Sequence, residues 1–307
     1  MTNPVRLISI CICTHKRPVG LRLALQSVLA LHVPFGHALE VVVVDNDTTP
    51  SASAVVDSFL NSSPTTFIQY IHEPLPGVSH ARNKCLDSAK GELLAFFDDD
   101  EQVEPGWLIE WLACMESTQA DAVFGPVHPT FETAPSSWIL ATGVHQRRRF
   151  TSGTVLPWSE TRTSNVAMRR SMLEGGHRFS TEFARTGGED SLFFATAQAR
   201  GRKLVWCDEA IVHETVPAHR MERNWILHRA FMGGRTYVRL EACLGHPLPY
   251  ITFALRGLAG SAVAIVKMVV YYLRGDIRHA HQLFRLYGHL GKIAARFYSR
   301  GPYAGGS

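Results

Sequence analysis

The feature that most constrains the fold is an alternation of short apolar runs with segments of helical periodicity through the first half of the chain. The runs have the length and the β-branched or apolar composition of buried strands. Such alternation is typical of α/β proteins, in which helices cover both faces of a mostly parallel sheet. The expected strands are Leu7–Cys13, Glu40–Val44, Phe67–Ile71, Leu93–Phe97 and Ala122–Val127, and the expected helices are Val19–Leu31, Ala52–Leu60, Val78–Ala89 and Pro105–Met115.

Polar clusters follow three of the expected strands. Thr14 to Pro18 follow the first strand, Asp45 to Asp47 the second, and Asp98 to Glu101 the fourth. In an open parallel sheet, ligands bind in the crevice beyond the carboxyl ends of the strands. We therefore expect the three clusters to meet at one edge of the sheet and to form a binding site there.

The acidic run is the strongest of these signals. Four consecutive carboxylates, Asp98 to Glu101, begin where the apolar strand Leu93–Phe97 ends. Like charges repel one another and cannot be buried cheaply without a counter-charge. A hard divalent cation such as Mg²⁺ takes one or two carboxylates and completes its shell with water and substrate phosphates, so Asp98 and Asp100 are candidate ligands. The alternative is an acidic turn in solvent.

Four other side chains are candidate nucleotide ligands. Asp45 suits hydrogen bonds from the NH of a base and the hydroxyls of a ribose, with a turn or a helix cap as the alternative. Thr14 and Arg17 suit the same ligand, or belong to a turn with an exposed cation. Arg82, in a helix that begins after Gly77, has a planar guanidinium that suits a phosphate or a base, and it is otherwise a surface arginine.

A second acidic pair, Glu189 and Asp190, stands at the start of an expected helix that ends at Gly201. One of these carboxylates suits a general base that takes a proton from an acceptor hydroxyl. Complementing the helix dipole is the alternative. His213 and the run Arg147–Arg149 are weaker candidates for holding a diphosphate or its metal, with a structural histidine and solvated arginines as the alternatives.

The chain is expected to form two domains, residues 1–216 and 217–307. In the first, the irregular sequence from Phe131 to Arg162 predicts loops over the site, and short strands are expected at Lys203–Cys207 and Ala210–His213. Loops vary more than the elements they connect, so we expect this stretch, together with Ser164–Met168, to decide which ligands the site selects.

Charge divides the chain at the same place. Residues 217–307 hold 13 Lys and Arg against 3 Asp and Glu, a balance of +10, and the preceding residues hold 18 against 24, a balance of −6. A basic segment beside an acidic body favours an anionic partner, either membrane phospholipid or a phosphorylated substrate.

The basic segment is expected to be helical over Met221–Leu240 and Ile277–Tyr298, with Tyr250–Gly275 as its most hydrophobic stretch. Arg256 and Lys267 interrupt that stretch, so no uninterrupted run reaches the roughly 18 to 20 residues that a spanning helix needs. The pattern favours a helix that lies on an anionic membrane surface or dips into it. The alternative is packing against the body or a second subunit, and the oligomeric state is unknown.

The N-terminal residues, MTNPVRLISICICTHKRP, lack the basic region and the long apolar run of a secretory signal. Six cysteines are scattered along the chain and favour buried thiols over disulfides or a zinc site. These features predict a cytoplasmic protein, which the basic segment would make peripheral on the cytoplasmic face of the membrane.

Taken together, these motifs resemble the inverting glycosyltransferases of family 2, which have the GT-A fold and build bacterial polysaccharides. The resemblance runs from Leu7 to His213 and rests on loose motifs in the order typical of the family. It implies a Rossmann-like α/β fold, with a mostly parallel central sheet and flanking helices, to which a C-terminal helical appendage is added. The motifs are ISICICTHKRP, VVVVDND, GVSHARNKCLDSAKGELLAFFDDDEQVEPGWL, SNVAMRR and GGED.

The resemblance also implies roles for the residues that bind the donor. Thr14, Arg17 and Asp45 look like the nucleoside-binding set. Arg82 looks like the residue that reaches the base or the phosphates. These positions would hold the nucleotide part of a nucleotide-sugar donor.

The family's Asp-x-Asp motif falls on Asp98, Asp99 and Asp100. By resemblance, Asp100 is the metal ligand, Asp98 lies nearer the ribose and a metal-bound water, and Asp98 and Asp99 contribute to donor binding. His213 is a further candidate ligand of the cation. The implied cofactor is a divalent metal, Mg²⁺ or Mn²⁺.

The family's Glu-Asp motif falls on Glu189 and Asp190, which makes Asp190 the catalytic base and Glu189 its partner in the catalytic motif. Processive members carry a Gln-x-x-Arg-Trp motif before membrane spans. This chain has only ERNWILHR, in which Trp225 follows Asn224, so the resemblance favours an enzyme that adds a single sugar.

The implied function is the transfer of a sugar, with inversion, from a nucleotide-sugar donor to a hydroxyl of a glycan or a lipid-diphosphate-linked acceptor. The donor is expected to be a UDP-sugar, and no nucleic-acid partner is expected. One alternative is a nucleotidyltransferase that makes a sugar nucleotide, although THKRP does not supply a glycine-rich phosphate loop. The other is a non-catalytic scaffold that binds a glycan or a nucleotide.

Overall fold

The structure, a computed structural model, describes residues 5–60 and 66–298 and divides the chain into two compact units. The sequence predicted one boundary, after residue 216, and that boundary remains a proposal. In the structure, two short upstream segments also group with the C-terminal helices. Unit 1 comprises Met1–His128, Arg148–Arg185 and Glu189–Glu214, and unit 2 comprises Pro129–Arg147, Thr186–Gly188 and Thr215–Ser307.

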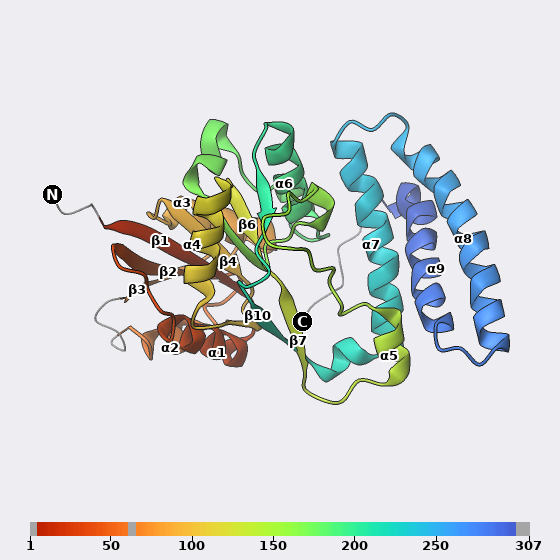
Figure 1. The fold of residues 1–307 in the computed structure, drawn as a ribbon, viewed down its shortest axis with the longest axis horizontal. Coiled ribbons are helices and arrows are strands. Elements are labelled where there is room, and N and C mark those ends of the chain that lie inside the picture. Colours follow the sequence, from red (N-terminus) through yellow and green to blue (C-terminus); the bar gives the residue numbers. More distant parts are fainter. Residues whose placement is uncertain (1–4, 61–65, 299–307) are drawn as a thin grey trace. The chain divides into compact units, whose positions relative to one another are not determined.

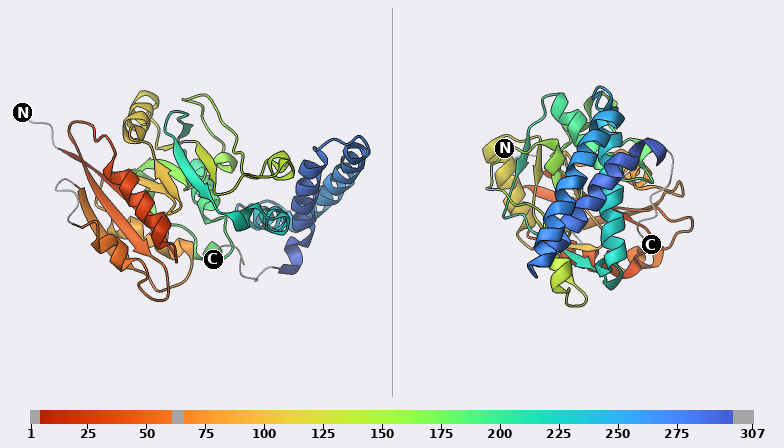
Figure 2. Two further views of the ribbon diagram at one scale, coloured as in Figure 1. Left: turned by 90° about the horizontal axis from the view of Figure 1, so that it is seen from below. Right: turned by 90° about the vertical axis from the view of Figure 1, so that its right-hand side faces the viewer.

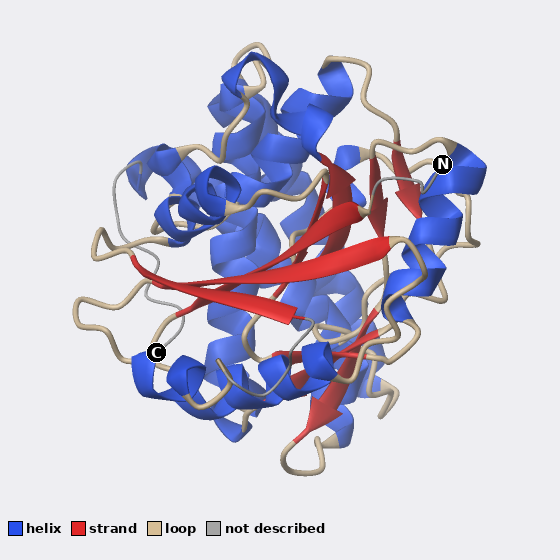
Figure 3. Ribbon diagram, turned by 90° about the vertical axis from the view of Figure 1, so that its left-hand side faces the viewer, coloured by secondary structure: helices blue, strands red, loops and turns tan. Residues whose placement is uncertain are grey.

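Unit 1 is built on a seven-stranded sheet with the order β3-β2-β1-β4-β8-β6-β9 (Figures 1 and 3). All of its strands are parallel except β8, which is antiparallel to both of its neighbours, β4 and β6. The predicted α/β class and the mostly parallel sheet are therefore confirmed. The strands are β1 (Arg6–Thr14), β2 (His37–Asp45), β3 (Thr66–His72), β4 (Leu93–Phe97), β6 (Ala122–Phe124), β8 (Asn165–Arg169) and β9 (Leu204–Trp206).

Helices cover both faces of this sheet because successive strand residues point to opposite sides. Ile10 and Ile12 of β1 belong to a core with residues of α1, α2 and α4. Cys11, between them, belongs to a second core with residues of α3 and α6. Five helices thus sandwich the sheet. They are α1 (Pro18–Leu29), α2 (Ser53–Asp57), α3 (Val78–Ser88), α4 (Trp107–Thr118) and α6 (Glu189–Ala199).

Several elements differ from the prediction. The segment SNVAMRR was not predicted as a strand, yet Asn165–Arg169 forms the buried strand β8 between β4 and β6. Ala122–Val127 is divided between β6 and a strand of a second sheet, and Ala210–His213 is shifted to a strand of that sheet. The second sheet has three strands in the order β5-β10-β7: β5 (Glu101–Val103), β10 (Val212–Val216) and β7 (Val127–Phe131).

Unit 2 contains the predicted C-terminal helices, and Figure 2 shows α7, α8 and α9 side by side. The stretch expected to be loops, Phe131–Arg162, holds a short helix, α5, because Ser136 caps its start by accepting from the NH of Ile139. The helices of unit 2 are α5 (Ser137–Thr142), α7 (Arg223–Cys243), α8 (Pro249–Leu273) and α9 (His279–Ala294).

Both units contain short 3₁₀ turns. Those of unit 1 are η1 (Trp158–Glu160), η2 (Arg170–Gly176) and η3 (Thr181–Phe183), and those of unit 2 are η4 (Ala218–Met221) and η5 (Ala295–Tyr298).

Helix α8 is one continuous apolar helix of 25 residues with a mean hydropathy of 1.7 in its most apolar window. By length and composition alone it could cross a membrane, which the sequence analysis did not expect. Only 22% of that window is buried in the structure, unlike the core helix of a soluble domain. Helix α8 packs through one side, formed by Phe253, Gly257, Ser261 and Ala264.

Candidate functional site

The predicted polar clusters meet at the carboxyl edge of the seven-stranded sheet. Strand β1 lies between β2 and β4, and Thr14 at its end pairs in register with Asp45 at the end of β2. The NH of Asn46 also donates to the Thr14 carbonyl, at 2.8 Å. The expectation that the three strand ends lie on one edge of the sheet is thereby confirmed, and their joint role as a binding site remains a proposal.

The acidic run is held by side chains from the first cluster. The Thr14 hydroxyl donates to Asp99 at 2.8 Å. Arg17 donates to Asp99 and to Asp100, each at 2.9 Å. Asp99, not Asp98 or Asp100, is therefore the carboxylate that points back into the fold, and it is only 4% exposed.

Burial changes the protonation of these groups. Burial raises the pKa of Asp99 to about 6, and Asp100 adds to the rise, while Arg17 and the Thr14 hydroxyl oppose it. Burial acts to lower the pKa of Arg17, but the carboxylates of Asp99 and Asp100 more than offset it and raise that pKa. Arg17 therefore stays charged and acts as a fixed counter-ion within the acidic run.

Arg82 connects the acidic run to the second acidic motif. It projects from α3, is 7% exposed, and donates to the carboxylate of Glu189 at the start of α6. Its other terminal nitrogen lies 3.7 Å from Asp98. The alternative that Arg82 is a surface arginine is therefore wrong, because its side chain is buried. The two carboxylates compensate a charge that burial would otherwise leave without a partner.

Glu189 and Asp190 have different surroundings although they are neighbours. Glu189 is 5% exposed, and its Oε2 atom has no hydrogen-bond partner. Burial raises its pKa to about 7, Arg82 opposes the rise, and Asp190 adds to it. Asp190 is partly exposed and accepts from the NH of Ser191 at 2.7 Å. Asp190 is thus the more accessible of the two carboxylates and Glu189 the one that holds Arg82.

Asp45 lies at the predicted edge but makes internal hydrogen bonds. Its Oδ2 accepts from the NH of Ala52 at 2.7 Å and from the Tyr70 hydroxyl at 2.9 Å. Its Oδ1 accepts from the NH of Asp47 at 3.2 Å, and the residue is 0% exposed. The bonds from the NH groups of Asp47 and Ala52 are those of a turn residue, the alternative that the sequence left open, and a nucleoside would have to exchange with these donors.

His213 lies on β10 and pairs with Gln102 of β5. Gln102 directly follows the acidic run in the sequence. Its Nε2 is 2.8 Å from a Glu104 carboxylate oxygen, and its ring packs edge-on against His128. A metal-binding histidine commonly uses its second nitrogen in such a bond with a carboxylate. This arrangement fits the predicted ligand role, which remains a proposal.

The donor set fits a divalent cation completed by a substrate. Within residues 5–60 and 66–298, no three His, Cys, Asp or Glu side chains are placed to hold a metal by themselves. Arg17 and Arg82 supply two positive charges against the four carboxylates they contact, Asp98, Asp99, Asp100 and Glu189. The excess of negative charge suits Mg²⁺ or Mn²⁺ sharing one or two carboxylates with a diphosphate.

The sequence analysis missed one supporting residue and one pairing of two predicted residues. Asn46 donates to the carbonyls of Glu73 and Leu75 and accepts from the NH of Gly77, which fixes the turn that opens α3. The signal was present in VVVVDND, where Asn46 separates two aspartates, but the asparagine was not weighed. The pairing of Arg82 with Glu189 had no signal, because 107 positions separate them.

Comparison with protein families gives a match to the model described as "Glycosyl transferase family 2" over residues 9–174. Succinoglycan biosynthesis protein ExoM of Rhizobium meliloti (strain 1021) is 37% identical over 256 residues, which is 81% of this chain and 79% of that protein. Glucosyl-dolichyl phosphate glucuronosyltransferase of Haloferax volcanii is 23% identical over 74% of this chain and 75% of that protein.

Solved structures share the fold at low identity. Mannosyltransferase PcManGT from Pyrobaculum calidifontis, in complex with GDP-Man and Mn²⁺, has a TM-score of 0.65 and 17% identity, with 95% of this chain and 88% of that chain covered. S. aureus TarS 1–349 in complex with UDP-GlcNAc has a TM-score of 0.55 and 15% identity, with 94% and 91% covered. At these identities the likeness concerns the fold.

Proposed function

The chain belongs to glycosyltransferase family 2, and on that premise we propose that it transfers one sugar from a nucleotide-sugar donor to a hydroxyl of a glycan or lipid-diphosphate-linked acceptor, with inversion. Its similarity to the succinoglycan biosynthesis protein ExoM supports a role in polysaccharide synthesis. The observation that carries the proposal is Arg82, which contacts Asp98 after β4 and Glu189 at the start of α6. These two contacts support the proposal that the acidic run and the Glu-Asp motif act in one site.

In the proposed reaction, Asp190 takes the proton of the acceptor hydroxyl as its oxygen attacks the anomeric carbon. The bond from that carbon to the donor diphosphate breaks on the opposite face, and the nucleoside diphosphate leaves with the bonding electrons. Inversion of configuration follows from this geometry, and no covalent enzyme intermediate is needed. Glu189 holds Arg82 beside the acidic run throughout.

Binding of the donor is proposed to involve Thr14, Arg17, Asp45, Arg82, Asp98 and Asp99. Asp100 is the proposed main metal ligand, and Asp98 and His213 are the candidates for a second protein ligand. A bound Mg²⁺ or Mn²⁺ would neutralise charge on the departing diphosphate. The proposed donor is a UDP-sugar. Thermal shifts with UDP and with GDP, each with and without Mn²⁺, test this, because a ligand that binds the native state raises its apparent stability. A larger shift with GDP plus metal would refute the UDP assignment.

Asp190→Asn tests the role of the base. We expect the transfer rate to fall about 10²- to 10⁴-fold, the usual contribution of a general base, with the nucleotide-induced thermal shift unchanged. Asp87→Asn, a change to an exposed carboxylate that pairs with Arg178, is the matched control. An unchanged rate in Asp190→Asn would remove this residue from the mechanism. If both variants still bind the nucleotide but the wild type transfers no sugar, the result would favour the alternative of a non-catalytic scaffold.

The other alternative function is that of a nucleotidyltransferase that makes a sugar nucleotide, and family membership also bears on it. A nucleotidyltransferase would release pyrophosphate from a nucleoside triphosphate and a sugar phosphate. The same preparation, supplied with those two substrates, should form no sugar nucleotide. Formation of a sugar nucleotide would revive that alternative.

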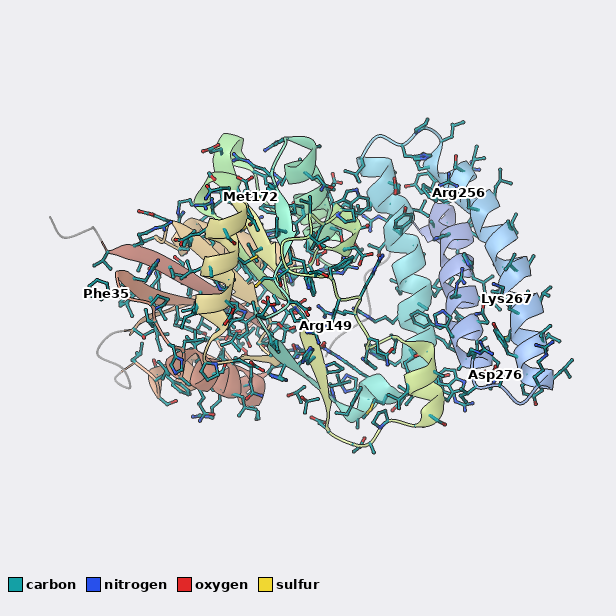
Figure 4. All side chains as sticks on the ribbon, viewed as in Figure 1. Phe35, Arg149, Met172, Arg256, Lys267 and Asp276 are labelled. Carbon is teal, nitrogen blue, oxygen red and sulfur yellow. The ribbon has the colours of Figure 1, made fainter. Side chains whose placement is uncertain are left out.

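We further propose that α8 docks on the cytoplasmic face of an anionic membrane. Its side opposite the packed residues is apolar and exposed, and Leu255, Val266 and Leu273 are 62%, 63% and 78% exposed. Arg256 and Lys267 lie along the same helix (Figure 4), where they suit anionic headgroups. An amphipathic helix of this kind lies at the interface with its apolar side in the acyl boundary.

Flotation with vesicles tests the docking. The full chain should float with vesicles of phosphatidylglycerol and phosphatidylcholine, and much less with phosphatidylcholine alone. Changing Leu255, Val266 and Leu273 to Asp should abolish flotation. Val19 and Phe35 are exposed apolar residues of unit 1, and changing both to Asp should leave flotation intact. A wild-type chain that stays in the soluble fraction would refute membrane docking.

A further inference from the structure

A shallow surface cavity of about 520 Å³, largely open to solvent, lies on unit 1 and is formed by the loop that holds Arg149 to Thr154 and by the turn that follows β9. The two segments are tied together. The NH of Asp208 donates to the Ser152 hydroxyl at 2.8 Å, that hydroxyl donates to Glu209, and the NH of Gly153 donates to the Trp206 carbonyl at 2.8 Å. The cavity is therefore bounded by a fixed loop and not by chance proximity of free side chains. Its volume is within the usual range of ligand sites, about 300 to 1,000 Å³.

The cavity opens on the same edge of the sheet as the acidic site. Strand β8 is antiparallel to both β4 and β6, and β9 is parallel to β6, so β4 and β9 end on the same edge. Three strand spacings of ~4.8 Å separate β4 from β9, which places the cavity roughly 14 Å along the edge from Asp98. That distance is too great for the sugar being transferred and suits a more distant part of the same acceptor.

The charges in the cavity disfavour a phosphate. Arg149 is its only basic lining residue, and it donates to both carboxylate oxygens of Asp208, at 2.9 and 2.8 Å. Glu209 adds a further carboxylate, so the lining is net negative. An anionic headgroup or diphosphate would be repelled, whereas a neutral ligand would not.

The remaining lining groups suit a neutral, hydroxyl-rich ligand. Thr151, Ser152 and Thr154 supply hydroxyls, of which Ser152 already donates to Glu209 and Thr154 to the Thr151 carbonyl. The carboxylates of Asp208 and Glu209 have further lone pairs that suit hydrogen bonds from sugar hydroxyls. Phe150 adds an apolar wall, and its ring is held edge-on against Trp206. Few convergent polar groups beside an aromatic ring are typical of a site that orients a small polar ligand.

A pair of histidines connects the cavity with the proposed metal ligand. Arg149 lies 3.2 Å from the Nε2 atom of His128, and the His128 ring packs against His213 at 5.7 Å between centroids. The cavity and the acidic site are therefore neighbouring parts of one surface of unit 1. Figure 4 marks Arg149.

We propose that this cavity binds a neutral sugar residue of the acceptor glycan, located before the residue that carries the accepting hydroxyl. The proposal rests on the proposed glycosyltransferase function and adds a subsite to it. Such a subsite binds acceptors that already contain several sugars more tightly than a single sugar.

The test uses binding, so that it does not depend on transfer. Neutral hexose oligosaccharides, from one to four sugars long and with α and β linkages, are titrated into the full chain and followed by saturation-transfer difference NMR. The longer members should bind the wild type, with signals that survive saturation by UDP and Mg²⁺. Thr151→Trp places an indole in the cavity from an exposed position and should weaken this binding by about tenfold or more.

Ser159→Trp is the matched control, because Ser159 is exposed in the same segment but does not line the cavity. It should bind the oligosaccharides like the wild type, and all three proteins should show the same nucleotide-induced thermal shift. The proposal is overturned if no oligosaccharide binds the wild type, or if Thr151→Trp binds as well as Ser159→Trp. Absence of the nucleotide shift in the wild type would instead count against the proposed donor site.

Discussion

At the scale of residues, the acidic run is organised by arginines that belong to the protein itself. Arg17 holds Asp99 and Asp100, and Arg82 lies beside Asp98. The protein thus compensates part of a charge density that the sequence alone assigned to a metal. A divalent cation and its diphosphate would then meet carboxylates whose positions are already fixed, which lowers the cost of ordering them on binding.

Asp99 predicts a pH dependence of stability. Its folded pKa, about 6, lies above the ordinary aspartate pKa of 3.8, so the folded state holds more protons than the unfolded state between these pH values. Stability from this group is therefore full below about pH 4 and is lost as the pH rises through 6. Asp99→Asn should remove that loss, and its unfolding free energy should rise relative to wild type by ~1–3 kcal/mol from pH 4 to pH 7, at about 1.4 kcal/mol per pKa unit.

Denaturant unfolding in the presence of a chelator measures this effect. Asp57→Asn, at an exposed carboxylate on α2, is the control and should follow the wild-type pH profile. A constant difference between Asp99→Asn and wild type across this pH range would contradict the assignment.

The buried pair of Arg82 and Glu189 predicts strong coupling. Removing one partner of a buried ion pair leaves a charge without compensation and typically costs about 3–5 kcal/mol, whereas replacing both by apolar residues is often nearly neutral. Arg82→Leu and Glu189→Leu should each destabilise the fold strongly, and the double variant should cost much less than their sum. Additive costs in a double-mutant cycle would show that the two side chains do not interact.

At the scale of elements, glycines set the close packing of the C-terminal helices. Helix α7 carries two consecutive glycines with opposite surroundings. A Cβ on Gly234 would fall on the Gly288 carbonyl of α9, and a Cβ on Gly233 would meet nothing within 4 Å. The two helices can therefore approach closely only because position 234 has no side chain.

This pair predicts opposite effects for one added methyl group. Gly233→Ala should stabilise the chain by up to about 1 kcal/mol through helix propensity. Gly234→Ala should destabilise it by about 1–3 kcal/mol, because α9 would have to move. Thermal unfolding of the full chain, with each variant as the control of the other, measures both. Equal effects would mean that α7 and α9 do not pack as described.

The same reasoning applies at the start of α3, which carries Arg82. Gly77 has φ of +129°, and a Cβ there would meet Ala184 at 2.6 Å, whereas Gly106 before α4 has open space around it. Gly77→Ala should lower both stability and donor affinity, since α3 positions Arg82. Gly106→Ala should change neither by more than about 1 kcal/mol. Unchanged donor affinity in Gly77→Ala would separate α3 from the donor site.

At the scale of the whole molecule, charge is divided along the chain, with a balance of −6 in residues 1–216 and +10 in residues 217–307. The acidic part carries the proposed site for a cation and a diphosphate, and the basic part carries α8. The excess of basic residues that would attract the C-terminal helices to an anionic surface therefore lies in a different part of the chain from the acidic run.

The division predicts a salt dependence of membrane binding. Attraction between exposed charges is screened over about 8 Å at physiological ionic strength and over about 3 Å at 1 M salt. The fraction of protein that floats with anionic vesicles should therefore fall as salt is raised. It should not reach zero, because the apolar side of α8 contributes a part that salt does not screen. Binding that salt leaves unchanged would exclude the electrostatic contribution.

The sequence by itself determined the fold class, most of the strands and the family. Apolar periodicity and strand-end chemistry are local properties, so Leu93–Phe97 and the acidic run after it were readable from neighbouring residues. The clusters at Thr14, Asp45 and Asp98 could be placed on one edge because parallel strands require it. The strands and the acidic run follow from the pattern of neighbouring residues, and the common edge follows from the rule that parallel strands end on the same side of a sheet.

Only the tertiary structure decided which charged groups face one another. The insertion of β8 between β4 and β6, the inward orientation of Asp99 and the pairing of Arg82 with Glu189 join residues that are far apart in the chain. Whether a carboxylate is buried, and beside which cation, depends on the packing of all the elements around it. That packing has no periodic signature in the sequence, and so the different burial of Glu189 and Asp190 emerged only from the fold.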